Sequence, residues 1–181
     1  MQVDARISKL AENILKNSVQ LQKGEKIYIE AFGASTKDFF NEMIKETIKL
    51  GAVPFYFYND ASFEKSLIEG ADKQQIEAYT AIHKCLMEDV DCYVAVRGYD
   101  DTFALADVKA EYMDLFGRIF QEQVHMRTRP PKTRWCVMRW PNTSMAAMSR
   151  MSLKQFEDFY FEACLLDYRK MGKAMQPLKE L

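Results

Sequence analysis

Four short apolar runs alternate with helical stretches along this chain, and this alternation restricts the possible folds more than any other feature of the sequence. The runs are rich in β-branched and aromatic residues, whereas the stretches between them repeat apolar side chains every three or four residues. Segments that alternate in this way form a parallel sheet with right-handed crossovers. We therefore expect a three-layer α/β fold, with a mostly parallel sheet of about four to five strands and helices on both faces. The strands are predicted at residues 27–31, 53–58, 93–96 and 135–139, with Val94 and Val137 buried.

The helical stretches carry recognisable signals at their ends. Asp4 is placed to cap the first helix, Ser35 and Thr36 to cap the second, and Ser152 with Gln155 matches a capping box at the last. The expected helices cover residues 4–17, 36–48, 63–67, 72–87, 108–120 and 151 to the end.

The chain is expected to form a single α/β domain over residues 1–181. Hydrophobic residues make up 48% of the sequence and aromatic residues 13%, which is ample for a packed core. No internal repeat or low-complexity linker divides the chain, and only Pro130 and Pro131 interrupt it sharply. The apolar segment 175–181 needs a surface to pack on, so we expect a longer natural chain.

The charge balance and the absence of apolar spans indicate a soluble, cytoplasmic protein. Lys and Arg total 25 against 26 Asp and Glu, a net charge of -1, whereas dedicated nucleic-acid binders usually show a basic excess. The N-terminus lacks the apolar core of a secretory signal, and no 18-residue apolar stretch is present. We therefore expect neither nucleic acid nor a membrane as a partner.

Cysteine and histidine spacing predicts no metal or catalytic site in this chain. His83 and His125 are 42 residues apart and no H-E-x-x-H motif occurs, so His83 is expected to be a surface or half-buried side chain. The cysteines form no C-x-x-C pair and each lies in an apolar run, so we expect them reduced and buried. They are Cys85, Cys92, Cys136 and Cys164.

Neither phosphate-binding fingerprint of α/β proteins is present. The glycines form no G-x-G-x-x-G or P-loop motif, and the turn at residues 31–36 is interpreted as an ordinary capped turn. The loop at 97–102 follows the third strand, at the carboxyl edge where open α/β sheets place ligands. Its adjacent Asp100 and Asp101 favour helix capping or a turn over acid/base chemistry, because neighbouring side chains point in different directions.

A second loop, at residues 125–135, is densely basic. An extended backbone before the prolines would place Arg127 and Arg129 on one side, ready to meet carboxylates, nucleic acid or solvent. We favour a carboxylate-rich partner surface, because arginine forms bidentate pairs with carboxylates. The candidate interdomain or dimer interface residues are Arg127, Arg129, Lys132, Arg134 and Trp135.

Several segments match one known family in order and spacing. They are RGYDDT at 97–102, HMRTR at 125–129, KTRW at 132–135, PNTSMA at 141–146, FEDFYF at 156–161 and LDY at 166–168. Together they resemble the N-terminal domain of the thermophilic-type metallo-aminopeptidases, the aminopeptidase T and aminopeptidase S group, over essentially all 181 residues.

This resemblance implies a function for the parent enzyme. Members are cytoplasmic, typically dimeric exopeptidases that remove N-terminal residues from peptides with two divalent metals, commonly zinc or cobalt. Their metal ligands and catalytic residues belong to a C-terminal domain that this sequence does not include, and none matches a residue here. The resemblance thus implies a non-catalytic domain, inactive alone, whose partners are that catalytic domain and a second subunit. The alternative is a stand-alone module that binds an anion or nucleic acid through the basic loop at 127–134.

Overall fold

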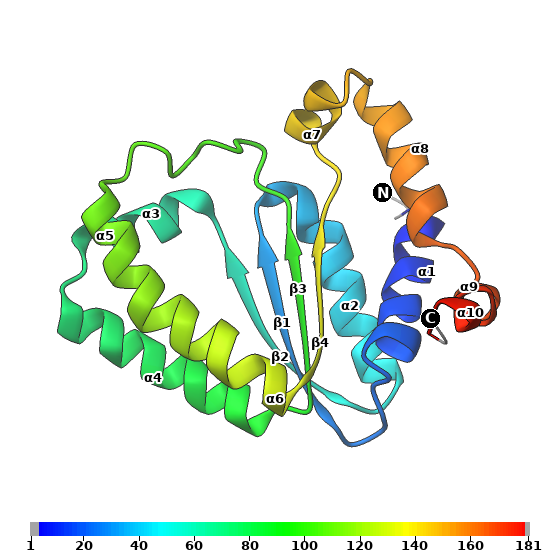
Figure 1. Ribbon diagram of the computed structural model, residues 1–181, viewed down its shortest axis with the longest axis horizontal. Coiled ribbons are helices and arrows are strands. Elements are labelled where there is room, and N and C mark those ends of the chain that lie inside the picture. Colours follow the sequence, from blue (N-terminus) through cyan, green and yellow to red (C-terminus); the bar gives the residue numbers. More distant parts are fainter. Residues whose placement is uncertain (1–3, 180–181) are drawn as a thin grey trace.

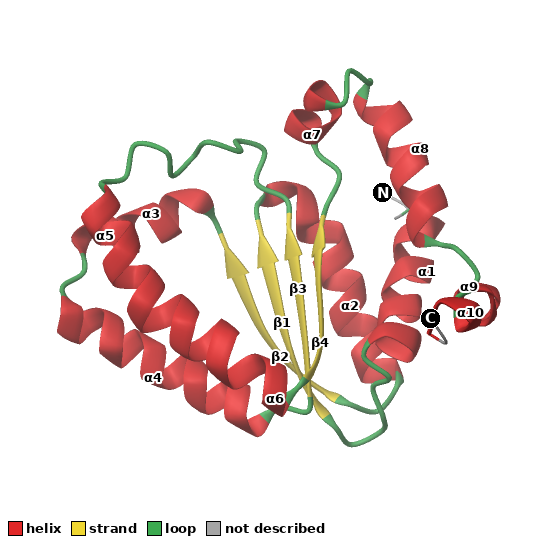
Figure 2. Ribbon diagram, viewed as in Figure 1, coloured by secondary structure: helices red, strands yellow, loops and turns green. Residues whose placement is uncertain are grey.

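A computed structural model describes residues 4–179 and contains a four-stranded, wholly parallel sheet, which confirms the predicted fold class. Figure 2 shows the strands side by side with helices on both sides. The order across the sheet is β2-β1-β3-β4. All four predicted strands are present, within a few residues of their expected ends: β1 Lys26–Phe32, β2 Val53–Asn59, β3 Cys92–Arg97 and β4 Arg134–Arg139.

Helices cover both faces of the sheet and complete the three layers, as Figure 1 shows. The face drawn on the right carries α1 Ala5–Asn13 with its π-helical extension η1 Ile14–Ser18, the short 3-10 turn η2 Ala34–Thr36, α2 Lys37–Lys49 and α8 Leu153–Cys164. The opposite face carries α3 Ala61–Gly70, α4 Lys73–Asp89, α5 Ala110–Phe116, the π-helix η3 Gly117–Thr128 and α6 Arg129–Lys132. Outside these layers lie α7 Thr143–Met148, α9 Tyr168–Ala174 and α10 Gln176–Lys179.

Alternation along the strands divides the apolar side chains between two cores. Ile29 and Val94 face α1, α2 and α8, whereas Tyr28 and Tyr93 face α4 and η3. Val94 is fully buried, as predicted. Val137 is only half-buried, because β4 is an edge strand with no neighbour on its outer side.

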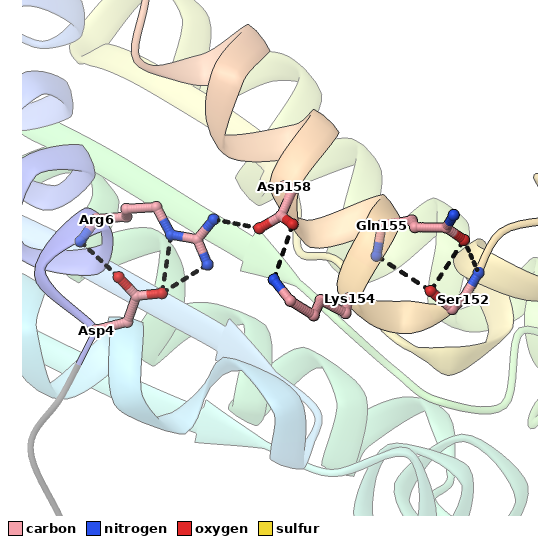
Figure 3. A network of polar contacts seen from close by, with 6 residues as sticks. All are labelled: Asp4, Arg6, Ser152, Lys154, Gln155 and Asp158. Atoms are coloured by element: carbon pink, nitrogen blue, oxygen red, sulfur yellow. Dashed lines mark hydrogen bonds and ion pairs between the residues drawn. The ribbon is translucent and has the colours of Figure 1, made fainter.

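The first and last long helices are joined by a polar contact shown in Figure 3. The Arg6 guanidinium on α1 lies 2.7 Å from Asp158 Oδ1 on α8 and 4.5 Å from the centroid of the Phe161 ring. The predicted caps at both helix starts are present: Asp4 accepts from the Arg6 N–H, and Ser152 forms a capping box with Gln155. Segments about 150 residues apart therefore complete one layer together.

The segment from 108 to 135 differs from the prediction. Instead of a helix to 120 followed by an extended basic loop, α5, η3 and α6 run without interruption to Lys132. In the π-helix each N–H bonds to the carbonyl five residues earlier, so buried positions recur at 119 and 124 and at 120 and 125. Pro130 and Pro131 lie in the first turn of α6, where missing N–H groups are tolerated. The extended backbone predicted around Arg127 and Arg129 is therefore wrong.

Smaller differences concern the C-terminal helix and the cysteines. The helical stretch expected from 151 onward is broken after α8, and two short helices follow. All four cysteines are free, and Cys92 is buried, but Cys85 is exposed on α4. No helix within residues 4–179 combines the length and apolarity needed to cross a bilayer.

The turns that follow β1 and β3 pack directly against each other. Gly33 has a φ of +90°, and a Cβ built on it would lie 2.5 Å from the Gly98 carbonyl oxygen. The Ser35 hydroxyl donates to that same oxygen at 2.6 Å, and the Thr36 hydroxyl donates to the Gly33 carbonyl oxygen. Neither hydroxyl caps α2, contrary to expectation. They hold the turn in place instead.

Gly33→Ala should destabilise the fold by roughly 2–5 kcal/mol, because it adds a clash with backbone atoms to an unfavourable φ. Gly117→Ala is the matched control: no neighbouring atom lies within 4 Å of its Cβ position and its backbone is helical, so a gain of about 0.5–1 kcal/mol is expected. Urea unfolding measures both. A Gly33→Ala variant as stable as the wild type would contradict the close approach.

Candidate functional site

A cavity of about 660 Å³ opens at the carboxyl ends of the strands, on the side of the sheet that faces α3 and η3. Its lining includes Glu30 and Phe32 of β1, Arg97 of β3 and Arg139 of β4. The inner strands β1 and β3 are neighbours, while their next strands lie on opposite sides, so this is the topological switch point of the sheet. Tyr99 and residues 101, 102 and 105 of the loop after the third strand also line the cavity.

The walls are mainly apolar, as in most small-molecule sites. They are formed by aromatic, leucine and methionine side chains of β1, α3, the loop after β3, α5, η3 and α7. These are Phe32, Phe63, Leu67, Leu105, Phe116, Phe120, Met145 and Met148.

The floor contains a buried carboxyl group held by two phenols. Glu30 is 2% exposed, accepts a hydrogen bond from Tyr28 at 2.5 Å, and accepts a second from Tyr93. Burial raises the pKa of Glu30, although the two hydroxyl donors and the Arg97 charge act in the opposite direction. Since Tyr28 gives its proton to Glu30, His83, whose Nδ1 lies 2.8 Å from the same hydroxyl, donates to it through an Nδ1–H.

His125 lies beside this carboxyl group as a neutral side chain. Its Nε2 is 3.9 Å from Glu30 Oε2, and its buried Nδ1 has no hydrogen-bond partner among the described residues. Burial, and then the charges of Arg129 and Arg97, lower the pKa of His125 to about 3. The contact with Glu30 is therefore not an ion pair near neutral pH.

The rim carries two adjacent cations. Arg97 and Arg139 are register partners at the last positions of β3 and β4, and both are exposed. Neither has a carboxylate within salt-bridge distance among residues 4–179. The rim acids have neutral partners: Glu64 accepts from the Tyr99 hydroxyl at 2.7 Å, and Asp101 accepts from the Phe103 N–H, the turn role predicted for one of the paired aspartates.

The five residues predicted as an interface lie outside this cavity. Arg127 is exposed and pairs with Glu122 at 2.9 Å, whereas Arg134 bonds to Glu25 and to the Val19 carbonyl oxygen. Lys132 is exposed.

Arg129 has a different environment from Arg127. It is buried, with its guanidinium carbon 4.4 Å from the Trp135 ring centroid and 5.4 Å from that of Tyr93. Trp135 remains 46% exposed. The extended backbone predicted Arg127 and Arg129 on one side. In the structure their side chains point in different directions, one to solvent and one into the protein.

The polar floor of the cavity was missed by the sequence reasoning. His83 was expected at the surface or half-buried, and this is wrong, because it is 2% exposed and packed among aromatic rings. One signal was present: Glu30 is the only charged residue between Lys26 and Lys37, within an apolar strand. A carboxyl group placed there needs buried donors, and Tyr28 lies two residues earlier on the same face.

Metal-binding residues do not gather anywhere in the described chain. Across residues 4–179, no three His, Cys, Asp or Glu side chains lie close enough together to hold a metal ion. The cavity's own acids and His125 are included in that finding, so the residues present do not fit a dinuclear metal centre.

Comparison with known proteins identifies one family. The sequence profile of the thermophilic metalloprotease family (M29) matches residues 3–177. No curated protein sequence matches the chain significantly. Among solved structures, wild-type AmpT from Thermus thermophilus aligns with a TM-score of 0.63 and 16% identity, over 88% of this chain and 42% of AmpT. The chain thus spans less than half of that protein's length, and the structural likeness concerns the fold.

Two oxidoreductases align more weakly. An alcohol dehydrogenase superfamily protein from Novosphingobium aromaticivorans gives a TM-score of 0.38 at 16% identity, over 92% of this chain and 49% of its own. The CurK enoyl reductase gives a TM-score of 0.31 at 14% identity, over 86% of this chain and 48% of its own. At these scores neither carries an argument about function.

The buried histidines predict that the free energy of unfolding falls by several kcal/mol as the pH drops from 7 to 5. Burial lowers the pKa of His83 to about 4, so the unfolded chain takes up a proton near pH 6.5 while the folded chain does not. Glu30, with its raised pKa, offsets part of this loss. His83→Gln keeps a donor for Tyr28 and should lose about 2 kcal/mol less over this range. Denaturant titrations at each pH measure the difference, and parallel profiles would contradict a neutral, buried His83.

Proposed function

Since this chain belongs to the thermophilic metalloprotease family (M29), we propose that it serves a metal-dependent aminopeptidase as its N-terminal, non-catalytic domain. The parent enzyme hydrolyses N-terminal residues from peptides, using two divalent metals in a separate C-terminal domain. The observation that carries the proposal is the extent of the two matches. The family profile covers residues 3–177, nearly this entire chain, whereas the aligned region is only 42% of AmpT.

The proposed division of labour agrees with the chemistry of the described residues. Two-metal hydrolysis needs carboxylates and histidines gathered around both ions, with a further carboxylate as base. No three such side chains cluster among the described residues, which supports the proposal that the zinc or cobalt of the parent lies in the C-terminal domain. The present domain would supply a wall and partial lid that admit peptide ends.

We also propose that the basic segment binds a partner, either the catalytic domain or a second copy in a cytoplasmic homodimer. Of the five candidates, Arg127, Lys132, Arg134 and Trp135 are exposed, and Arg129 is buried. Arg129 and Arg134 act mainly within the chain, through the Trp135 ring and Glu25. An exposed tryptophan flanked by cations is typical of protein interfaces.

The purified chain should contain no stoichiometric zinc or cobalt and should leave amino-acid arylamides uncleaved, because no described cluster can hold a metal. Elemental analysis after dialysis and a chromogenic peptidase assay measure both properties, with a metal-loaded enzyme of the same family as the positive control. Stoichiometric metal together with chelator-sensitive cleavage would contradict the non-catalytic assignment.

The joint substitution Arg127→Ala with Lys132→Ala should weaken self-association of the chain about tenfold or more, without changing its stability. Sedimentation velocity over a concentration series measures the first property and urea unfolding the second. Lys9→Ala, an exposed lysine on α1, is the matched control and should leave both unchanged.

Arg129→Ala distinguishes folding from assembly. Because its guanidinium is buried against Trp135 and Tyr93, this variant should lose roughly 2 kcal/mol of stability. Two results would refute a homodimer through this segment. One is a chain that stays monomeric at every concentration, and the other is a dimer whose association is unchanged by the double substitution of Arg127 and Lys132.

A further inference from the structure

We propose that the cavity at the carboxyl edge binds a small organic monoanion, an apolar body that ends in a carboxylate, with the carboxylate held between Arg97 and Arg139. This ligand site does not include the basic segment, whose five candidate residues lie outside the cavity. The proposal does not depend on the role of this chain in an aminopeptidase.

The first argument is the arginine pair itself. Side chains at register positions of neighbouring strands project from the same face about 5 Å apart, and like charges in this arrangement repel. Natural sheets usually place an acid beside such a pair, yet no carboxylate of the described residues lies within 4 Å of either guanidinium. A bound carboxylate would offer two oxygens to the two guanidinium groups and relieve this repulsion.

The second argument is the position of Arg97 over an apolar wall. Its guanidinium carbon lies 5.7 Å from the centroid of the Phe32 ring, so the cation borders an apolar part of the lining. The lining also contains Phe116 and Phe120, which stack with their centroids 4.9 Å apart. An anion bound at the rim would thus place its apolar part against these rings. A cavity of about 660 Å³ is large enough for such a molecule.

The third argument comes from the acids around the cavity, which limit the charge of the ligand. Glu30, Glu64 and Asp101 all line the cavity, so two arginines face several carboxyl groups. These acids repel a phosphate or polyphosphate more strongly than a single negative charge placed next to the arginines. The cavity therefore favours a monoanion over a multiply charged ligand. A free carboxylic acid and the C-terminus of a short peptide both meet this description, because each combines an apolar body with a terminal carboxylate.

Isothermal titration calorimetry on the full chain tests the proposal with 4-phenylbutanoate, its neutral amide, the dipeptide Ala-Phe and inorganic phosphate. The acid should bind, and the amide and phosphate should bind about tenfold more weakly or not at all. Arg97→Gln and Arg139→Gln should each weaken binding of the acid by a similar factor. Arg118→Gln is the control and should leave this binding unchanged, because Arg118 is an exposed residue of η3 outside the cavity. If Ala-Phe binds more tightly than 4-phenylbutanoate, the carboxylate comes from a peptide C-terminus. If 4-phenylbutanoate binds more tightly than Ala-Phe, the ligand is a free acid.

A two-dimensional NMR titration of the wild type locates the site without any substitution. The acid should shift the backbone signals of residues 97–102 and 139–142 at the cavity rim. Equal affinity for acid and amide, unchanged binding in both arginine variants, shifts confined to another surface, or no binding of either carboxylate would each overturn the proposal.

Discussion

The buried carboxyl group of Glu30 is the interaction on which the cavity and the central strands both depend. Tyr28 and Tyr93 are register partners on β1 and β3, so the two hydroxyls that satisfy Glu30 come from neighbouring strands. A one-residue slip would turn Glu30 into the apolar core beneath α1 and α2 and leave it without donors. The cost of burying a carboxyl group without hydrogen-bond donors therefore enforces the pairing that positions Arg97 at the cavity rim.

The fold could be predicted from local pattern, because a strand one residue out of phase or a helix without an apolar face cannot bury its apolar side chains. The four strands and the parallel order follow from that requirement. Residues 117–132 could not be predicted in the same way. The π-helix repeats its buried positions at five residues, as at Phe120 and His125, and no template with a period of 3.6 detects this. A helical continuation was therefore interpreted as a basic loop.

The candidate site could be predicted only in part, because it is built from contacts between residues that lie far apart in the sequence. The position of the cavity followed from topology, since ligands bind beyond the carboxyl ends of parallel strands. In its polar floor, Glu30 accepts from Tyr93, 63 positions away, and Tyr28 bonds to His83, 55 positions away; the sequence shows neither contact. The same limitation explains why the buried position of Arg129 was not predicted. Beside Arg127 it resembles a surface cation, but the turn of the helix directs it onto Trp135.

The contact between α1 and α8 has a consequence for the order in which the protein can be completed during synthesis. The ribosome releases the chain from its N-terminus, so Arg6 emerges long before Asp158, its partner 152 residues later. Until α8 emerges, the outer side of α1 lacks its covering, and the Trp140 ring lacks the Phe161 ring against which it packs. The nascent polypeptide thus exposes this side of its first helix until the residues around Asp158 have been synthesised.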